Sequence, residues 1–144
     1  MKTAIINESM IQHLTQKINS QEEFKYVLAI DFDHTICMSN YPEVGPIKED
    51  AKEVINTLYK EGFGIIINTC REGLPLASAI NWLKENDIPY HYINCNFPYL
   101  ITKYKADCRK ISADMYIDDK NINGIPEWKE IYLIIQNKFK INEK

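Results

Sequence analysis

The sequence predicts an α/β domain built on a three-layer, doubly wound parallel sheet of the Rossmann-like kind. Strand-like and helix-like segments alternate along the chain, the strand-like segments are apolar nearly throughout, and polar residues follow them directly. Alternating strands and helices are typical of a parallel sheet, and strands covered on both faces are apolar at almost every position. The 144 residues suit one domain with a core of its own.

The first core strand is expected over residues 26–32, followed by a turn-rich loop and a helix over 48–61. Apolar residues in this helix recur at i, i+3, i+4 and i+7, and Gly62 stands where a glycine commonly ends a helix. The same patterns predict strands over 63–68, 90–93 and 113–117 and helices over 74–85 and 128–139. Residues 94–109 show no clear periodicity.

Residues 1–24 precede the first core strand and are expected to form a helical extension to the domain at 25–144. Four apolar residues repeat every fourth position and share one helical face. They are Ile6, Met10, Leu14 and Ile18. This face could pack on the body of the domain or form a contact with a second copy or a partner, so a homo-oligomer stays open.

Composition excludes several classes of function. Lys and Arg number 17 against 20 Asp and Glu, and a net charge of −3 does not favour bulk nucleic-acid binding. No apolar run is long enough to span a membrane, and the N-terminal residues lack the apolar stretch of a signal peptide. The four cysteines are widely spaced without a CxxC pair, unlike a zinc site. We therefore expect a cytoplasmic protein with reduced thiols and no membrane partner.

Polar residues stand at the carboxyl ends of three predicted strands: Asp31-Phe-Asp33-His-Thr35, then Asn68-Thr69, then Asp118-Asp119. Each alone is typical of a turn or a helix cap. Parallel strands bring their carboxyl ends to one edge, where ligands bind if the strand order reverses. Carboxylates that converge there repel one another unless a cation neutralises them, and Mg²⁺ takes oxygen ligands. The sequence thus predicts a Mg²⁺ site at this edge.

These segments resemble the motifs of the haloacid dehalogenase (HAD) superfamily of phosphotransferases. Asp31 to Thr35 is similar to its first motif, DxDxT, and Thr69, Lys110 and the Asp118-Asp119 pair are similar to the second, third and fourth. The resemblance covers about residues 26–135. It is strongest to small bacterial and phage hydrolases, through Thr69-Cys-Arg-Glu72, Lys110 to Asp119, and Gly124-Ile-Pro-Glu-Trp128.

The resemblance implies a Mg²⁺-dependent phosphatase that acts through an aspartyl-phosphate. Asp31 would be the nucleophile, and Asp33 would protonate the leaving oxygen and then activate water. The carboxylates of Asp31 and Asp118, with the backbone carbonyl of Asp33, would hold Mg²⁺. Asp119 would orient a metal-bound water or the catalytic lysine.

The remaining implied roles concern the phosphoryl group. The Thr69 hydroxyl would bind it, and Lys110 would offset its negative charge. Lys103 and Lys105 also precede the acidic pair and stay open as alternatives to Lys110.

Three residues are candidates for substrate contacts. His34 could line the entrance, and Arg71 could clamp a second anionic group or be an ordinary surface arginine. Cys70 adjoins Thr69 and is expected to be a packed thiol. The segments between the motifs are too short for a folded cap domain, so we expect an open site for a phosphorylated substrate, small or large. The sequence does not specify which.

Two other functions fit parts of the pattern. A receiver domain uses a similar set of residues, but its acidic pair comes first in the chain and its phosphorylated aspartate later, the reverse of the order here. A HAD-like binding or regulatory module without catalysis would be expected to lack Asp31 or Asp33, and both are present. The phosphatase is therefore the main expectation.

Overall fold

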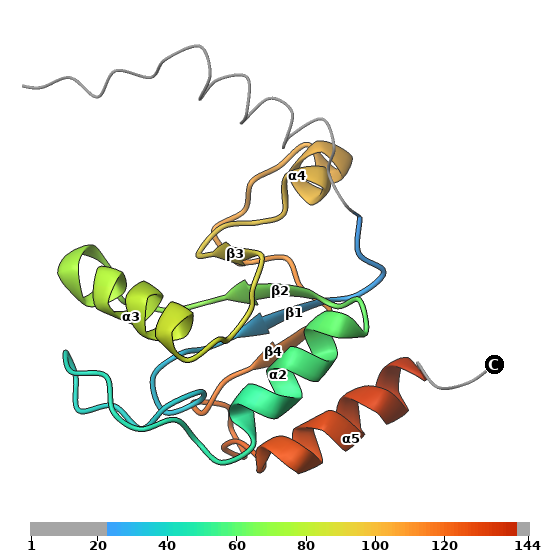
Figure 1. The fold of residues 1–144 in the computed structure, drawn as a ribbon. Coiled ribbons are helices and arrows are strands. Elements are labelled where there is room, and N and C mark those ends of the chain that lie inside the picture. Colours follow the sequence, from blue (N-terminus) through green and yellow to red (C-terminus); the bar gives the residue numbers. More distant parts are fainter. Residues whose placement is uncertain (1–22, 141–144) are drawn as a thin grey trace, which may run out of the picture.

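The computed structural model describes residues 23–140 (Figure 1). The amphipathic pattern predicted for residues 1–24 lies almost wholly outside the described residues. Four parallel strands form one sheet in the order β3-β2-β1-β4. They are β1 (Val27–Ile30), β2 (Gly64–Ile67), β3 (Tyr92–Ile93) and β4 (Met115–Ile117).

The strand order reverses beside β1. The chain passes from β1 to β2 and then β3 on one side, and returns to place β4 on the other side. All four residues of β1 and of β2 are buried, which explains why their sequences are apolar throughout. The carboxyl ends of β1 and β4 therefore flank the point at which a sheet of this kind binds its ligands.

Helices cover the two faces of the sheet unequally. Helices α2 (Ala51–Lys60), α3 (Gly73–Glu85) and α5 (Trp128–Phe139) pack on one face around the larger apolar core, and α2 and α5 lie side by side (Figure 1). Among the described residues, the other face carries only α4 (Pro98–Tyr104) and the segments around it. Connections between parallel strands are right-handed, so the direction in which the chain crosses the sheet decides which face the connecting helix covers. The connections from β1 to β2 and from β2 to β3 run one way, and the connection from β3 to β4 runs the other way, so α4 lies on the opposite face. The three-layer prediction is confirmed.

The predicted elements are present, with shifted ends. The helix expected from residue 48 begins at Ala51, because Asp50 has a φ of 64° and cannot continue a helix toward the N-terminus. Gly62 has a φ of 95° just after α2, as expected for a glycine that ends a helix. Helix α4 was not predicted. It has seven residues, none of them buried, and so leaves no periodic apolar signal.

A short excursion after β1, residues 37–47, is called the flap below. Antiparallel bridges join Cys37 to Ile47 and Asn40 to Glu43. Gly45 is required there, because a Cβ at this position would overlap the carbonyl oxygen of Met38. Over residues 23–140 neither this connection nor the one after β2 holds an inserted domain, as expected. None of the helices in this range is long and apolar enough to cross a bilayer.

Candidate active site

The segment after β1 turns sharply and leaves two carboxylates at the edge of the sheet. The Asp31 N–H donates to the Ile117 carbonyl at 2.9 Å, which continues the pairing of β1 with β4 by one residue. Phe32 points into the core, fully buried and edge-on to Trp82 at 5.5 Å between ring centroids. Asp33 follows at the edge, because alternate residues of an extended chain face opposite sides.

Thr35 connects the ends of β1 and β4 through its side-chain hydroxyl. Its buried hydroxyl lies 3.0 Å from an Asp31 carboxylate oxygen and 3.3 Å from one of Asp119, and it accepts a hydrogen bond from the Asp119 N–H at 3.1 Å. Its carbonyl accepts the indole N–H of the buried Trp128 at 2.8 Å. The sequence motifs contained Thr35 and Trp128 without a predicted role, and the structure shows that both hold this turn in place.

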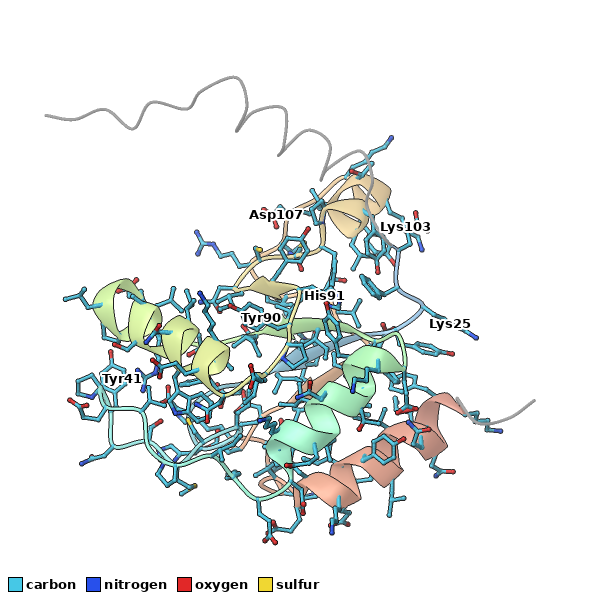
Figure 2. The ribbon with its side chains drawn as sticks, viewed as in Figure 1. Lys25, Tyr41, Tyr90, His91, Lys103 and Asp107 are labelled. Carbon is cyan, nitrogen blue, oxygen red and sulfur yellow. The ribbon has the colours of Figure 1, made fainter. Side chains whose placement is uncertain are left out.

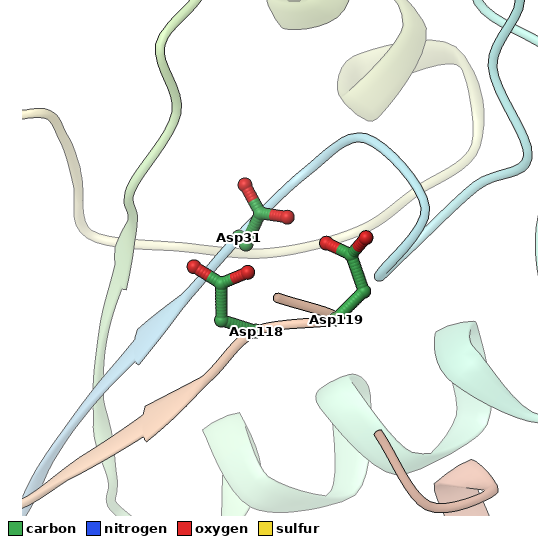
Figure 3. A group of neighbouring side chains, drawn as sticks. All are labelled: Asp31, Asp118 and Asp119. Atoms are coloured by element: carbon green, nitrogen blue, oxygen red, sulfur yellow. The ribbon is translucent and has the colours of Figure 1, made fainter. Parts of the chain in front are cut away.

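The carboxylates of Asp31, Asp118 and Asp119 converge at the ends of β1 and β4 (Figure 3). One oxygen of each lies within 4.8 Å of the others. Asp118 is oriented by the Lys120 N–H, which donates to its Oδ1 at 2.9 Å in a local turn. Asp119, predicted to act through a water or a lysine, thus also lies where its carboxylate could reach a shared cation.

The charges in this cluster are not balanced. Burial, together with a hydrogen bond to Asp119 and the charge of Asp118, raises the pKa of Asp31 to about 7. Burial also acts to raise the pKa of Asp119, but hydrogen bonds from Asp31 and Thr35 outweigh it and the pKa is lowered. Asp31 therefore keeps its proton to a higher pH than an ordinary carboxyl group, and Asp119 accepts a hydrogen bond from it. Repulsion among the carboxylates disfavours the ionised form of Asp31, and a bound cation would relieve that repulsion. Such a set of oxygen ligands fits a hard divalent cation such as Mg²⁺.

Asp33 lies in a different environment, paired with Arg71. The guanidinium donates through Nε to Asp33 Oδ2 at 2.8 Å and through Nη2 to Asp33 Oδ1 at 2.7 Å. Its Nη1 donates to the carbonyl oxygens of Pro42 at 2.8 Å and Pro75 at 3.1 Å. The guanidinium also lies 5.3 Å from the centroid of the Phe32 ring and 5.1 Å from that of Tyr41.

This geometry corrects the expectation for Arg71. Its side chain is only 1% exposed, so it is neither a surface arginine nor open to an anionic group of a substrate. It acts on Asp33 instead. Burial alone would raise the pKa of Asp33, but the Arg71 guanidinium and the Ser39 hydroxyl outweigh that effect and lower it. The Asp33 carboxylate is therefore ionised.

Thr69 lies at the end of β2, where the sequence placed it. Its N–H donates to the side-chain oxygen of Asn94 at 2.8 Å, and its hydroxyl accepts the Arg71 N–H at 3.1 Å. In these contacts the hydroxyl serves as acceptor and keeps its proton for an anionic oxygen. Asn94, which follows β3, was not predicted, because nothing in the sequence indicates that β3 lies beside β2.

The remaining candidates are all exposed. The Lys110 ammonium is 5.1 Å from the centroid of the Tyr116 ring, and the ion pairs formed among residues 23–140 do not include it, Lys103 or Lys105. Cys70 is exposed, so the expectation of a packed thiol is wrong: it lies on a turn after β2 and outside the core. His34 is exposed next to Asp33, with a φ of 62°.

Fold and site together define a doubly wound α/β domain with an acidic cluster at its switch point. A solved structure of a conserved protein from Bacteroides thetaiotaomicron is 33% identical, with a TM-score of 0.71 over 83% of this chain and 98% of that one. This chain belongs to the same family as that conserved protein.

Other comparisons are weaker. A structure of the Pnkp1/Rnl/Hen1 RNA repair complex shows 14% identity and a TM-score of 0.47, over 83% of this chain and 52% of that one. A structural-genomics target from Vibrio cholerae shows 20% identity and a TM-score of 0.44, over 82% of this chain and 99% of that one. No protein-family model matches the sequence, and no curated protein does.

Proposed function

We propose that this chain is a Mg²⁺-dependent phosphatase of the HAD type that hydrolyses phosphomonoesters through an aspartyl-phosphate on Asp31. The observation that carries the proposal is the convergence of Asp31, Asp118 and Asp119 beside Asp33, at the point where the strand order reverses. The motif residues come from segments more than 80 positions apart and meet at one edge, as phosphoryl transfer requires.

The carboxylates of Asp31 and Asp118, with the backbone carbonyl of Asp33, are the groups proposed to hold Mg²⁺, and Asp119 lies close enough to join them. When bound, Mg²⁺ supplies positive charge that screens the phosphoryl oxygens from the attacking carboxylate. The proton that Asp31 holds is then expected to leave, which frees the carboxylate as a nucleophile.

The proposed reaction has two displacements. An Asp31 carboxylate oxygen attacks phosphorus, the bond to the leaving oxygen breaks, and a proton that the Asp33 carboxylate has taken up from solvent neutralises that oxygen. Water then attacks phosphorus and gives its proton to the Asp33 carboxylate, the bond to Asp31 breaks, and inorganic phosphate leaves. The Thr69 hydroxyl donates to a phosphoryl oxygen, and Lys110 is proposed to offset its charge.

The test is phosphate release from p-nitrophenyl phosphate, sugar phosphates and nucleotides, with and without Mg²⁺, by the wild type and Asp31→Asn. Wild-type release that needs Mg²⁺, with a loss of at least about 10⁴-fold in Asp31→Asn, is expected. The exposed Asp87, in the turn that follows α3, gives a matched control in Asp87→Asn. Substantial activity in Asp31→Asn would exclude the covalent mechanism. No release by the wild type from any substrate would favour a binding or regulatory module instead.

A further inference from the structure

Arg71 is the one charged side chain among residues 23–140 that is buried. Burying a guanidinium is costly unless its donors are satisfied, and here four hydrogen bonds satisfy it: two to the Asp33 carboxylate and one each to the Pro42 and Pro75 carbonyls. An arginine this close to the site and closed to the substrate can affect the reaction only through the groups it holds.

The group that it holds most tightly is the Asp33 carboxylate. Two parallel hydrogen bonds to a planar guanidinium fix both the position and the plane of a carboxylate, which a single contact does not. The Asp33 side chain remains 24% exposed, so water can still reach it. Each of its oxygens has a further lone pair that the pairing with Arg71 leaves for another donor.

The same residue connects three other parts of the site. Its Nη1 and its stacking against Tyr41 hold the tip of the flap, where Figure 2 shows Tyr41 at the end of the excursion near α3. Its contact with Pro75 reaches the first turn of α3. Its backbone N–H donates to the hydroxyl of Thr69. Arg71 thus links the flap and Asp33 through its side chain and the proposed phosphoryl-binding threonine through its backbone.

We propose that Arg71 is a positioning residue for the hydrolytic step: it holds the Asp33 carboxylate in the orientation in which that carboxylate takes the proton of the attacking water. This inference rests on the proposed function. In that step the water oxygen bonds to phosphorus, the bond between phosphorus and Asp31 breaks, and the water proton passes to Asp33. Because two hydrogen bonds hold the Asp33 carboxylate in one plane, its orientation is set before the water arrives.

The experiment compares Arg71→Lys with the wild type on p-nitrophenyl phosphate. Lysine keeps the charge but cannot make the paired contact to Asp33 and reach both carbonyls. The nitrophenolate leaves without needing a proton, so kcat/KM reports formation of the aspartyl-phosphate independently of Asp33. We expect kcat to fall about 100-fold with a parallel fall in KM, and kcat/KM to change less than about 3-fold. Arg71→Lys should also show an initial burst of nitrophenolate, with an amplitude close to the enzyme concentration.

Two results would overturn the inference alone. One is a fall in kcat/KM as large as that in kcat, without a burst, which a general loss of structure would produce. The other is an unchanged kcat. A wild type without turnover or phosphate incorporation would overturn the proposed function, and this inference with it.

A second variant covers the case in which Arg71→Lys does not fold. Tyr41→Ala removes the ring that packs on the outer face of the guanidinium and leaves all four of its hydrogen-bonding partners. We again expect kcat to fall more than kcat/KM, here by about 3-fold. Tyr104→Ala is the matched control, because Tyr104 is similarly exposed and also has a cation over its ring, Lys103 at 5.4 Å. A Tyr41→Ala variant with the kinetics of Tyr104→Ala would overturn the inference.

Discussion

Asp31 and Asp33 are two residues apart on one turn, yet their surroundings are opposite. Asp31 faces Asp118 and Asp119, and its pKa is raised to about 7. Asp33 faces a buried arginine and is ionised. Phe32 between them is buried in the core. Two identical side chains thereby acquire different electrostatic surroundings, which suit Asp31 to the proposed role of cation ligand and nucleophile and Asp33 to the proposed role of acid and base.

The largest effect is expected when the acidic cluster loses a cation ligand. Asp118→Ala should weaken Mg²⁺ binding at least about 100-fold, because a direct ligand contributes more than the groups that orient it. Titration calorimetry with Mg²⁺ measures this, with Asp87→Ala as a control for the loss of one exposed carboxylate. A Mg²⁺ titration indistinguishable from that of the wild type would remove Asp118 from the metal site.

The difference between the two environments also predicts how stability depends on pH. A pKa of about 7 for Asp31, raised from 3.8, means that the folded state binds a proton which the unfolded state has lost. This contribution to stability is complete below pH 4 and is lost as pH rises through 7. In the metal-free protein, Asp31→Asn should therefore gain stability over the wild type with rising pH, by on the order of 2 kcal/mol.

Urea unfolding of both proteins in EDTA at pH 5 and pH 8 measures this gain. Added Mg²⁺ should reduce it, because the cation stabilises only the wild-type cluster. A difference in the free energy of unfolding that is the same at both pH values would contradict the charge imbalance assigned to Asp31.

Removing the lysine that offsets the phosphoryl charge is expected to have a smaller effect, and one that can be measured separately. Lys110→Ala should lower kcat/KM for phosphomonoesters about 10-fold, since an exposed ammonium contributes less than a buried donor to the phosphoryl group. Lys103→Ala and Lys105→Ala are matched controls on the same exposed segment and should stay within about 2-fold. A larger loss in either control would transfer the role to that lysine.

The smallest effect is expected at the flap. Tyr41→Ala should lower the free energy of unfolding by about 1 kcal/mol, because its ring packs on a desolvated guanidinium. Tyr104→Ala should cost less than about 0.5 kcal/mol, since the cation over Tyr104 belongs to an exposed lysine. Thermal unfolding compares the two. Equal losses would show that Arg71 gains nothing from the flap.

Much of the fold follows from local pattern. The apolar runs of β1 and β2 and the apolar spacing of α2 are visible in the sequence because burial requires them. The carboxylates at the strand ends follow as well, since a parallel sheet brings these ends together. Helix α4 could not be predicted, because a short helix without buried residues leaves no such pattern.

The supporting contacts of the site were also out of reach of the sequence. Arg71 pairs with Asp33 across 38 positions, and Trp128 holds Thr35 across 93. Neither separation has a periodic signal, and an arginine near a phosphate site is equally consistent with binding the substrate. Only its hydrogen bonds to the flap and to the first turn of α3 show that the arginine points inward.

Trapping the phosphorylated enzyme is the most direct test of the proposed aspartyl-phosphate on Asp31. The protein is incubated with a phosphomonoester and Mg²⁺, quenched in acid and reduced with borohydride, and the labelled peptide is located by mass spectrometry. Label on Asp31, absent with EDTA and in Asp31→Asn, is the predicted result. Steady phosphate release without label on Asp31, or with label on another carboxylate such as Asp33 or Asp118, would contradict an aspartyl-phosphate on Asp31.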